Sequence, residues 1–254
     1  MPQAIRSCGS VQSIIPTSGV TTSLHTILAL MKQRWWKDLA LTKTLSFARD
    51  RVVEAYYWIL GVYYEPQFSR ARVMATKIVL ITSILDDIYD DYSTLEESQL
   101  LTDAIQRWDF EAVDQLPEYS KDFFLKLLFA VREFETELAA EEKFRIFYLK
   151  EALKSQARAY FEESRWRDEK YVPTLEEHLG VSKMSTTYPL LASAILVGMG
   201  EVATKEAFEW AASFPKIVDA SSAIGRIMND ITSYEVINPH DFPHSPVVYG
   251  LVMW

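Results

Sequence analysis

Closely spaced carboxylates are the most informative chemical feature of this chain. In the segment Leu85-Asp-Asp-Ile-Tyr-Asp-Asp91, Asp86 and Asp90 are four residues apart and would share one helix face, with Asp87 beside them. Like charges on one face repel each other unless a cation compensates them. Such oxygen ligands suit Mg²⁺, which takes one or two carboxylates and completes its shell with water or substrate phosphates. The alternative is a solvated acidic helix end, although the apolar run before Asp86 favours a buried helix.

A second pair of oxygen-bearing side chains lies near the other end of the chain. Asn229 and Ser233 are also four residues apart, so an amide oxygen and a hydroxyl would share a helix face. This spacing is common on ordinary helix surfaces and is weak by itself. It gains weight from the acidic segment upstream and from Arg226, because the guanidinium fork is suited to bidentate phosphate contacts.

Further cations precede the acidic segment. Arg49 and Arg51 flank Asp50, and Lys77 opens the apolar run that leads to the aspartates. Arginine could contact phosphate here as well. Arginines beside an aspartate are usually surface ion pairs, however, and that is the default interpretation of Arg51.

Long helices would have to position these side chains. Apolar residues recur three and four apart within residues 47–63, 69–92, 121–140 and 142–163, as expected for amphipathic helices. Prolines 66, 117, 173 and 215 punctuate this pattern, and no sustained period-two alternation is present. The sequence therefore predicts an all-α fold, a single bundle of about eight to ten helices. One buried stripe is expected at Phe124, Leu127, Leu128, Val131, Phe134 and Leu138.

Composition narrows the function classes. With 26 basic and 35 acidic residues the formal net charge is −9, which disfavours binding to nucleic-acid phosphates. The single cysteine, Cys8, excludes an internal disulfide framework and a cysteine-based zinc site. No apolar run approaches the roughly 18 residues of a membrane helix. The pairs Glu141–Glu142 and Glu162–Glu163 are interpreted as solvated helix faces.

Several segments in order resemble the plant terpene synthases, specifically the catalytic α-domain of the sesquiterpene type. The resemblance runs from about Arg34 to Val236 and implies the class I terpene synthase bundle. It rests on Arg49-Asp-Arg51, Glu54-Ala-Tyr-Tyr-Trp58, Gly61-Val-Tyr-Tyr-Glu-Pro-Gln67, Asp86-Asp-Ile-Tyr-Asp90, Ala104-Ile-Gln-Arg-Trp-Asp109 and Asn229-Asp-Ile-Thr-Ser233.

The resemblance implies a role for each matching residue. Asp86 and Asp90 would bind two Mg²⁺ ions with support from Asp87, and Asn229 with Ser233 would hold a third. Mn²⁺ is a possible substitute. The residues implied to contact a prenyl diphosphate are the arginines 49 and 226 at its diphosphate, Arg51 at the leaving group, Trp58 on the pocket wall, and Thr186 and Thr187 at a helix break beside the reacting chain.

The sequence departs from the family pattern at its two ends. Ile237 stands where the resemblance expects the glutamate of the third metal site, and residues 237–254 contain Pro239, Pro243 and Pro246, which cannot continue a helix. We therefore expect a leader at 1–33, the metal-binding α-domain at 34–236 and a non-helical tail at 237–254, with the bundle incomplete at its C-terminal end. Exposed apolar faces could make an otherwise monomeric protein self-associate.

Three functional interpretations follow. The first is a Mg²⁺-dependent sesquiterpene synthase that ionises and cyclises farnesyl diphosphate, with geranyl diphosphate as the other candidate substrate. The second is an inactive truncated synthase that binds metal or prenyl diphosphate, or modulates a full-length relative. The third, a chain-elongating prenyl synthase, ranks lowest because a second DDxxD is expected there. We expect the cytoplasm. The plastid is the alternative, because the first 37 residues contain no Asp or Glu, as in an organelle transit peptide.

Overall fold

The computed structural model describes Leu45, Ala48 and residues 50–236, and every structural statement below concerns this part of the chain. The predicted leader and tail, together with Arg49 and Ile237, lie outside it. Within the described part all regular structure is helical, which confirms the all-α prediction. The α-helices are α4 (Val52–Val62), α5 (Ser69–Asp87), α6 (Leu95–Arg107), α7 (Glu118–Glu137), α8 (Phe144–Asp168), α9 (Leu175–Ser185), α10 (Tyr188–Val197), α11 (Lys205–Ala212) and α12 (Lys216–Val236).

Short helical turns and prolines separate the long helices. The 3₁₀ turns are η3 (Pro66–Phe68), η5 (Phe110–Gln115), η6 (Ala140–Glu142) and η7 (Gly200–Val202), and η4 (Ile88–Tyr92) is a π turn. Each of the four punctuating prolines lies at a junction between helices, as predicted. Thr94 and Thr174 form capping boxes with glutamates three residues later, which fixes where α6 and α9 begin.

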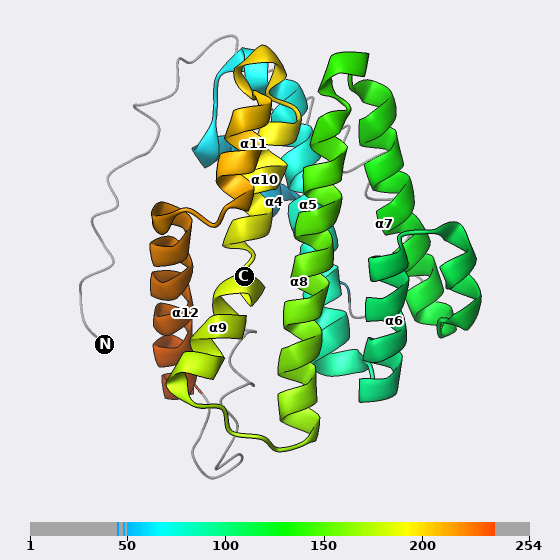
Figure 1. Cartoon of the computed structure of the whole chain (residues 1–254), viewed down its shortest axis with the longest axis vertical. Helices are drawn as coiled ribbons and strands as arrows, with labels where there is room; N and C mark the ends of the chain where they lie inside the picture. The colour runs from blue at the N-terminus through cyan, green and yellow to red at the C-terminus, as the bar shows by residue number, and fades with distance from the viewer. Residues whose placement is uncertain (1–44, 46–47, 49, 237–254) are drawn as a thin grey trace.

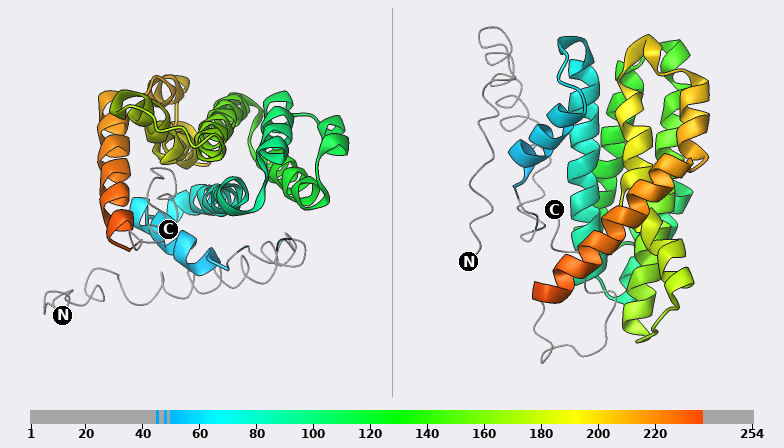
Figure 2. Two further views of the ribbon diagram at one scale, coloured as in Figure 1. Left: turned by 90° about the horizontal axis from the view of Figure 1, so that it is seen from below. Right: turned by 90° about the vertical axis from the view of Figure 1, so that its left-hand side faces the viewer.

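The centre of the bundle is formed by α5 and α8. Helix α5 packs against α4 and α10, while α8 packs against α6, α9 and α10 (Figures 1 and 2). The apolar stripe predicted on α7 is buried throughout, from Phe124 to Leu138. None of the described helices is long and apolar enough to cross a membrane.

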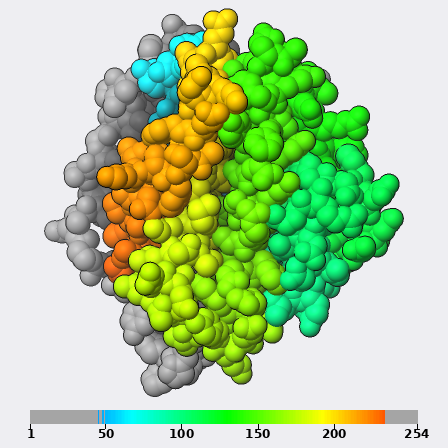
Figure 3. Space-filling view, viewed as in Figure 1, coloured from blue at the N-terminus to red at the C-terminus, as the bar shows by residue number. Residues whose placement is uncertain are grey.

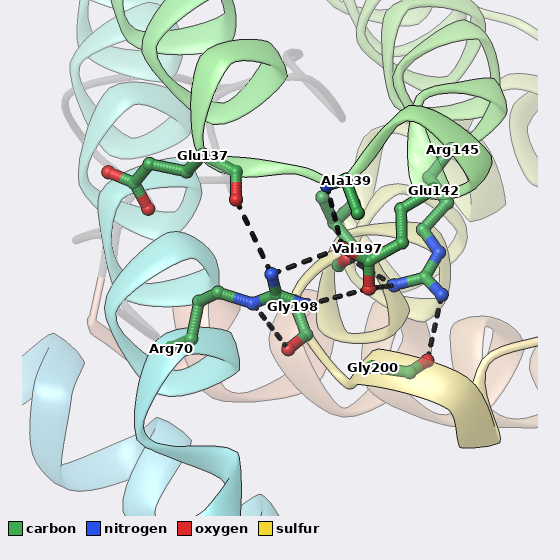
Figure 4. A network of polar contacts seen from close by, with 8 residues as sticks. All are labelled: Arg70, Glu137, Ala139, Glu142, Arg145, Val197, Gly198 and Gly200. Atoms are coloured by element: carbon green, nitrogen blue, oxygen red, sulfur yellow. Dashed lines mark hydrogen bonds and ion pairs between the residues drawn. The ribbon is translucent and has the colours of Figure 1, made fainter.

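A buried ionic network ties three helix ends together (Figure 4). Glu142 accepts hydrogen bonds from Arg70 of α5 at 2.7 Å and from Arg145 of α8 at 2.8 Å. Arg145 also donates to the carbonyl oxygens of Val197 at 3.0 Å and Gly200 at 2.7 Å, at the end of α10. The interpretation of Glu142 as part of a solvated face is therefore wrong: its residue is only 8% exposed, because it neutralises two arginines.

The same corner requires a glycine. A Cβ atom built on Gly198 would lie 2.6 Å from the Cα atom of Ala71 and 2.8 Å from its amide nitrogen. Contacts that short with backbone atoms are not tolerated, so the absence of a side chain allows α10 to approach α5. Arg70 donates to the Gly198 carbonyl at 3.2 Å across this contact.

Candidate metal and diphosphate site

The acidic segment lies where α5 passes into the π turn η4. Asp86 and Asp87 end α5, and Asp90 lies within the π turn, a wider turn that often occurs at functional sites. Asp87 is 6% exposed and the side chain of Asp90 is 14% exposed. The aspartates are thus enclosed by the bundle, and the solvated helix end considered from the sequence does not describe them.

The negative charges of these carboxylates repel one another, and this repulsion changes their pKa values. Burial raises the pKa of Asp86 well above its usual range, with further increases from the charges of Asp90, Asp87 and Glu163, against a lowering by a hydrogen bond from Tyr160. Burial and the charge of Glu163 raise the pKa of Asp90 to about 7. The protein groups present therefore compensate the negative charge incompletely, which is the situation a bound divalent cation would relieve.

Helix α8 supplies residues that the sequence analysis did not identify. Arg167 donates to the Tyr89 carbonyl at 2.7 Å and forms an ion pair with Asp90 at 3.6 Å. Glu163 accepts a 2.8 Å hydrogen bond from the Ser185 hydroxyl, and burial raises its pKa. The solvated-face interpretation is therefore wrong for Glu163.

A signal for these residues was present in the sequence. Tyr160, Glu163 and Arg167 are three and four residues apart, so they share one face of a long helix. Tyr160 is 4% exposed. A polar stripe on a helix that is central to an apolar bundle indicates a site, because buried polar groups must find partners.

Helix α12 presents the second motif to the same region. Arg226 and Asn229 are each 7% exposed, and the Arg226 Nη2 atom donates to the Asn229 Oδ1 atom at 2.5 Å. The positive charge of Arg226 acts to lower the pKa of both Asp90 and Glu163, so α12 faces the acidic segment. The structure thus brings together two motifs that are far apart in the chain. Ser233 belongs to α12, but its side chain lies outside the described part.

Two of the predicted substrate residues, Arg51 and Trp58, lie at α4. Arg51 forms a 3.0 Å ion pair with Glu54, and its guanidinium carbon lies 5.7 Å from the centre of the Trp58 ring. The Arg51 side chain is 17% exposed, so this ion pair is partly buried. Trp58 is half-buried and packs against the main core, which also contains Leu85, Ile88 and Tyr89 beside the aspartates.

The predicted helix break is present between α9 and α10. Helix α9 ends at Ser185 and α10 begins at Tyr188, so Thr186 and Thr187 form the break. Thr187 has a φ of +67°, a left-handed conformation that is costly for a β-branched residue. A Cβ atom on Gly225 of α12 would lie 2.6 Å from the Tyr188 ring, so α12 passes directly against this break.

The oxygen donors of the acidic segment and of α12 suit Mg²⁺. Carboxylate oxygens come from Asp86 and Asp90, an amide oxygen comes from Asn229, and the crowded carboxylates lack sufficient positive charge. Among the described residues no three Asp, Glu, His or Cys side chains form a ready-made metal group. Mg²⁺ takes one or two protein carboxylates and shares its remaining positions with water or substrate phosphates.

Comparison with known proteins agrees with this geometry. Residues 37–243 match the model of the terpene synthase family, metal binding domain. The alpha-humulene synthase of Zingiber zerumbet is 60% identical over 79% of this chain, and the (S)-beta-bisabolene synthase of Zingiber officinale is 58% identical over 79%. The chain belongs to the terpene synthase family.

Solved structures extend the comparison. Isoprene synthase from grey poplar, in complex with three Mg²⁺ ions and dimethylallyl-S-thiolodiphosphate, superposes with a TM-score of 0.81 at 32% identity, over 89% of this chain and 43% of that one. A limonene synthase with 2-fluorolinalyl diphosphate gives a TM-score of 0.74 at 34% identity, over 84% and 41%. The class I terpene synthase fold is thereby confirmed. This chain spans only 37% of the length of the humulene and bisabolene synthases that it matches.

Proposed function

We propose that this chain carries out the Mg²⁺-dependent ionisation and cyclisation of farnesyl diphosphate to a sesquiterpene, with release of diphosphate. The observation that carries the proposal is that Asp90, in the same half-buried acidic segment as Asp86, lies within reach of the charge of buried Arg226, which donates to buried Asn229. Carboxylates facing an arginine across an enclosed space suit a metal–diphosphate group, which carries both positive and negative charge.

The residues of the chain have separable tasks in this reaction. Asp86, held by the Tyr160 hydroxyl, and Asp90, held near Arg167, would present oxygen atoms to the metal. Arg226 would bind phosphate oxygens and stabilise the charge that develops as the diphosphate leaves. Bound Mg²⁺ would supply the further positive charge that this departure requires.

The apolar part of the substrate needs an enclosed, dry pocket. Once diphosphate has left, the allylic cation must be protected from water while the chain closes, and proton loss or water capture then ends the reaction. Trp58 and the break at Thr186 and Thr187 remain our predicted pocket residues. An aromatic face contributes about 0.5–2 kcal/mol to cation stabilisation.

Farnesyl diphosphate is the preferred substrate because the curated relatives include synthases of humulene, bisabolene and germacrene D.

We propose two Mg²⁺ ions at Asp86 and Asp90 and a weaker third at Asn229 and Ser233, since Ile237 offers no carboxylate. Arg49 remains a proposed diphosphate ligand, Mn²⁺ a proposed substitute for Mg²⁺, and the cytoplasm the proposed compartment.

The experiment is product analysis by gas chromatography and mass spectrometry. The purified chain is incubated with Mg²⁺ and either farnesyl or geranyl diphosphate, beside an Asp86→Asn variant. We expect a sesquiterpene from farnesyl diphosphate that the variant does not form. A folded wild-type chain that releases no diphosphate and forms no terpene from either substrate would contradict the proposal.

A further inference from the structure

A histidine of α9 reaches across to the helix that carries the diphosphate arginine. His178 is the fourth residue of α9, directly after the Thr174–Glu177 capping box that fixes the start of this helix. Its Nε2 atom lies 3.1 Å from the Oδ2 atom of Asp230 on α12. A carboxylate can only accept, so Nε2–H is the donor of this hydrogen bond. Figure 3 shows α9 and α12 on one face of the molecule, in contact with each other.

Asp230 also interacts with Arg226, so it links His178 to this arginine. Its Oδ1 atom forms an ion pair with the Arg226 Nη2 atom at 2.7 Å, one helical turn away, while its other oxygen is held by His178. The same Nη2 atom donates to Asn229. The guanidinium is therefore held between two neighbouring side chains of α12, one of which is itself held from α9.

The side chains of this interaction chain are largely shielded from water, which strengthens their electrostatic contacts. The side chains of Arg226, His178 and Asp230 are 9%, 15% and 29% exposed, so Arg226 and His178 are largely shielded from water. Without His178, the Asp230 carboxylate could rotate towards solvent and leave the arginine less constrained. A guanidinium that is already held in one orientation loses less conformational entropy when it binds an anion, so it binds more tightly.

We propose that His178 is a positioning residue for diphosphate binding, acting through Asp230 on Arg226. This rests on the proposed function, because it assigns Arg226 to the diphosphate. The chemical class that benefits is a Mg²⁺-complexed diphosphate, whose oxygens require a guanidinium already oriented towards them.

The test is calorimetric titration of inorganic diphosphate in saturating Mg²⁺, with melting temperatures recorded for each variant. His178→Phe keeps a ring but removes the donor, whereas His178→Gln keeps an amide donor. We expect about a tenfold loss of affinity in the first and substantial rescue in the second. Lys183→Met is the matched control, because it breaks a second ion pair between α9 and α12, that of Lys183 with Asp219.

Each outcome is decisive. Loss in His178→Phe with rescue in His178→Gln, while Lys183→Met binds normally, would support the positioning role. Unchanged affinity in His178→Phe would overturn it, as would equal losses in His178→Phe, His178→Gln and Lys183→Met that follow their melting temperatures. A wild-type chain that binds no Mg²⁺–diphosphate would overturn the proposed function itself, and this role with it.

Discussion

At the scale of single residues, Asp86 is held in a position that is unfavourable for a charge. It is enclosed in the bundle, it hydrogen-bonds to Tyr160, and the nearest charges that act on it are negative. A cation that binds here therefore stabilises the folded chain, because the unfolded chain offers no comparable site.

Asp86→Asn should remove this stabilisation. We expect Mg²⁺ with diphosphate, at about 100 times its dissociation constant, to stabilise the wild type by about 2.7 kcal/mol and the variant by almost nothing. Urea unfolding with and without the ligands measures both. Asp91→Asn is the control, because Asp91 is an exposed neighbour in the same motif. Equal stabilisation of all three proteins would contradict the assignment of Asp86.

At the residue scale, spacing in the sequence pointed to the acidic segment, whereas contacts between helices could not be predicted from it. The four-residue spacing singled out Asp86 and Asp90, and the charge of Arg226 on α12 acts on Asp90. Glutamates 142 and 163 were assigned to solvent because charged residues on helices usually lie there. The polar stripe of α8 could have indicated Glu163, whereas the contact of Glu142 with Arg70 joins residues 72 apart, which no local pattern reveals.

At the scale of helices, the contact between α5 and α10 depends on Gly198. We expect Gly198→Ala to lower the free energy of unfolding by about 3 kcal/mol, because the added methyl group overlaps the backbone of Ala71. Gly180→Ala is the matched control: it lies inside α9 with nothing within 4 Å of a Cβ, and should stabilise by about 0.5–1 kcal/mol. Denaturant unfolding measures both, and equal effects would contradict the close approach.

The network at Glu142 predicts how stability depends on pH. Burial acts to raise the pKa of Glu142, but hydrogen bonds from Arg70 and the Ala139 amide, with the charge of Arg145, outweigh it and lower the pKa below its ordinary 4.5. A lowered carboxyl pKa means that the unfolded chain binds the proton more readily. The stabilisation is therefore complete above about pH 4.5 and is lost as the pH falls through the folded-state value.

Glu142→Gln tests this dependence. At neutral pH the variant should be less stable by about 3 kcal/mol, because two arginines lose their partner while one of them, Arg145, stays buried. Below about pH 4 the difference should shrink, since the wild-type glutamate is then protonated as well. Urea unfolding across this range measures it, and a difference that does not change with pH would contradict the network's role.

At the scale of the whole molecule, α12 has its polar side chains on the face towards the bundle and its apolar side chains on the exposed face. Its inward face carries polar side chains, whereas Ile217, Ile224, Met228 and Ile231 on its outer face are between 51% and 65% exposed. Exposed apolar stripes of this kind promote association.

We expect the isolated chain to associate as its concentration rises, and Ile224→Glu to weaken this association about tenfold. Burying one isoleucine contributes about 1.5 kcal/mol or more, which corresponds to this factor. Sedimentation velocity over a concentration series measures it. Val202→Glu is the control, because Val202 is equally exposed at 64% but lies in η7, away from the stripe. A monomeric wild type at all concentrations would contradict the expectation.

The architecture was largely predictable from the sequence, and its assembly was not. The three- and four-residue periodicity predicted the helices, and the prolines predicted where they end. Both signals depend only on local backbone geometry. The packing of α12 against α10 and α9 depends on Gly225 against Tyr188 and on His178 against Asp230. These contacts join residues distant in the chain, so local patterns carry no record of them.

The central claim is that the end of α5 and the inner face of α12 form one metal–diphosphate site. The most direct test is a crystal structure of the chain with Mn²⁺ and inorganic diphosphate, in which anomalous scattering locates the metal. We predict Mn²⁺ at the carboxylates of Asp86 and Asp90, with diphosphate between it and Arg226. Metal bound elsewhere, or diphosphate bound without contact to Arg226, would contradict the account.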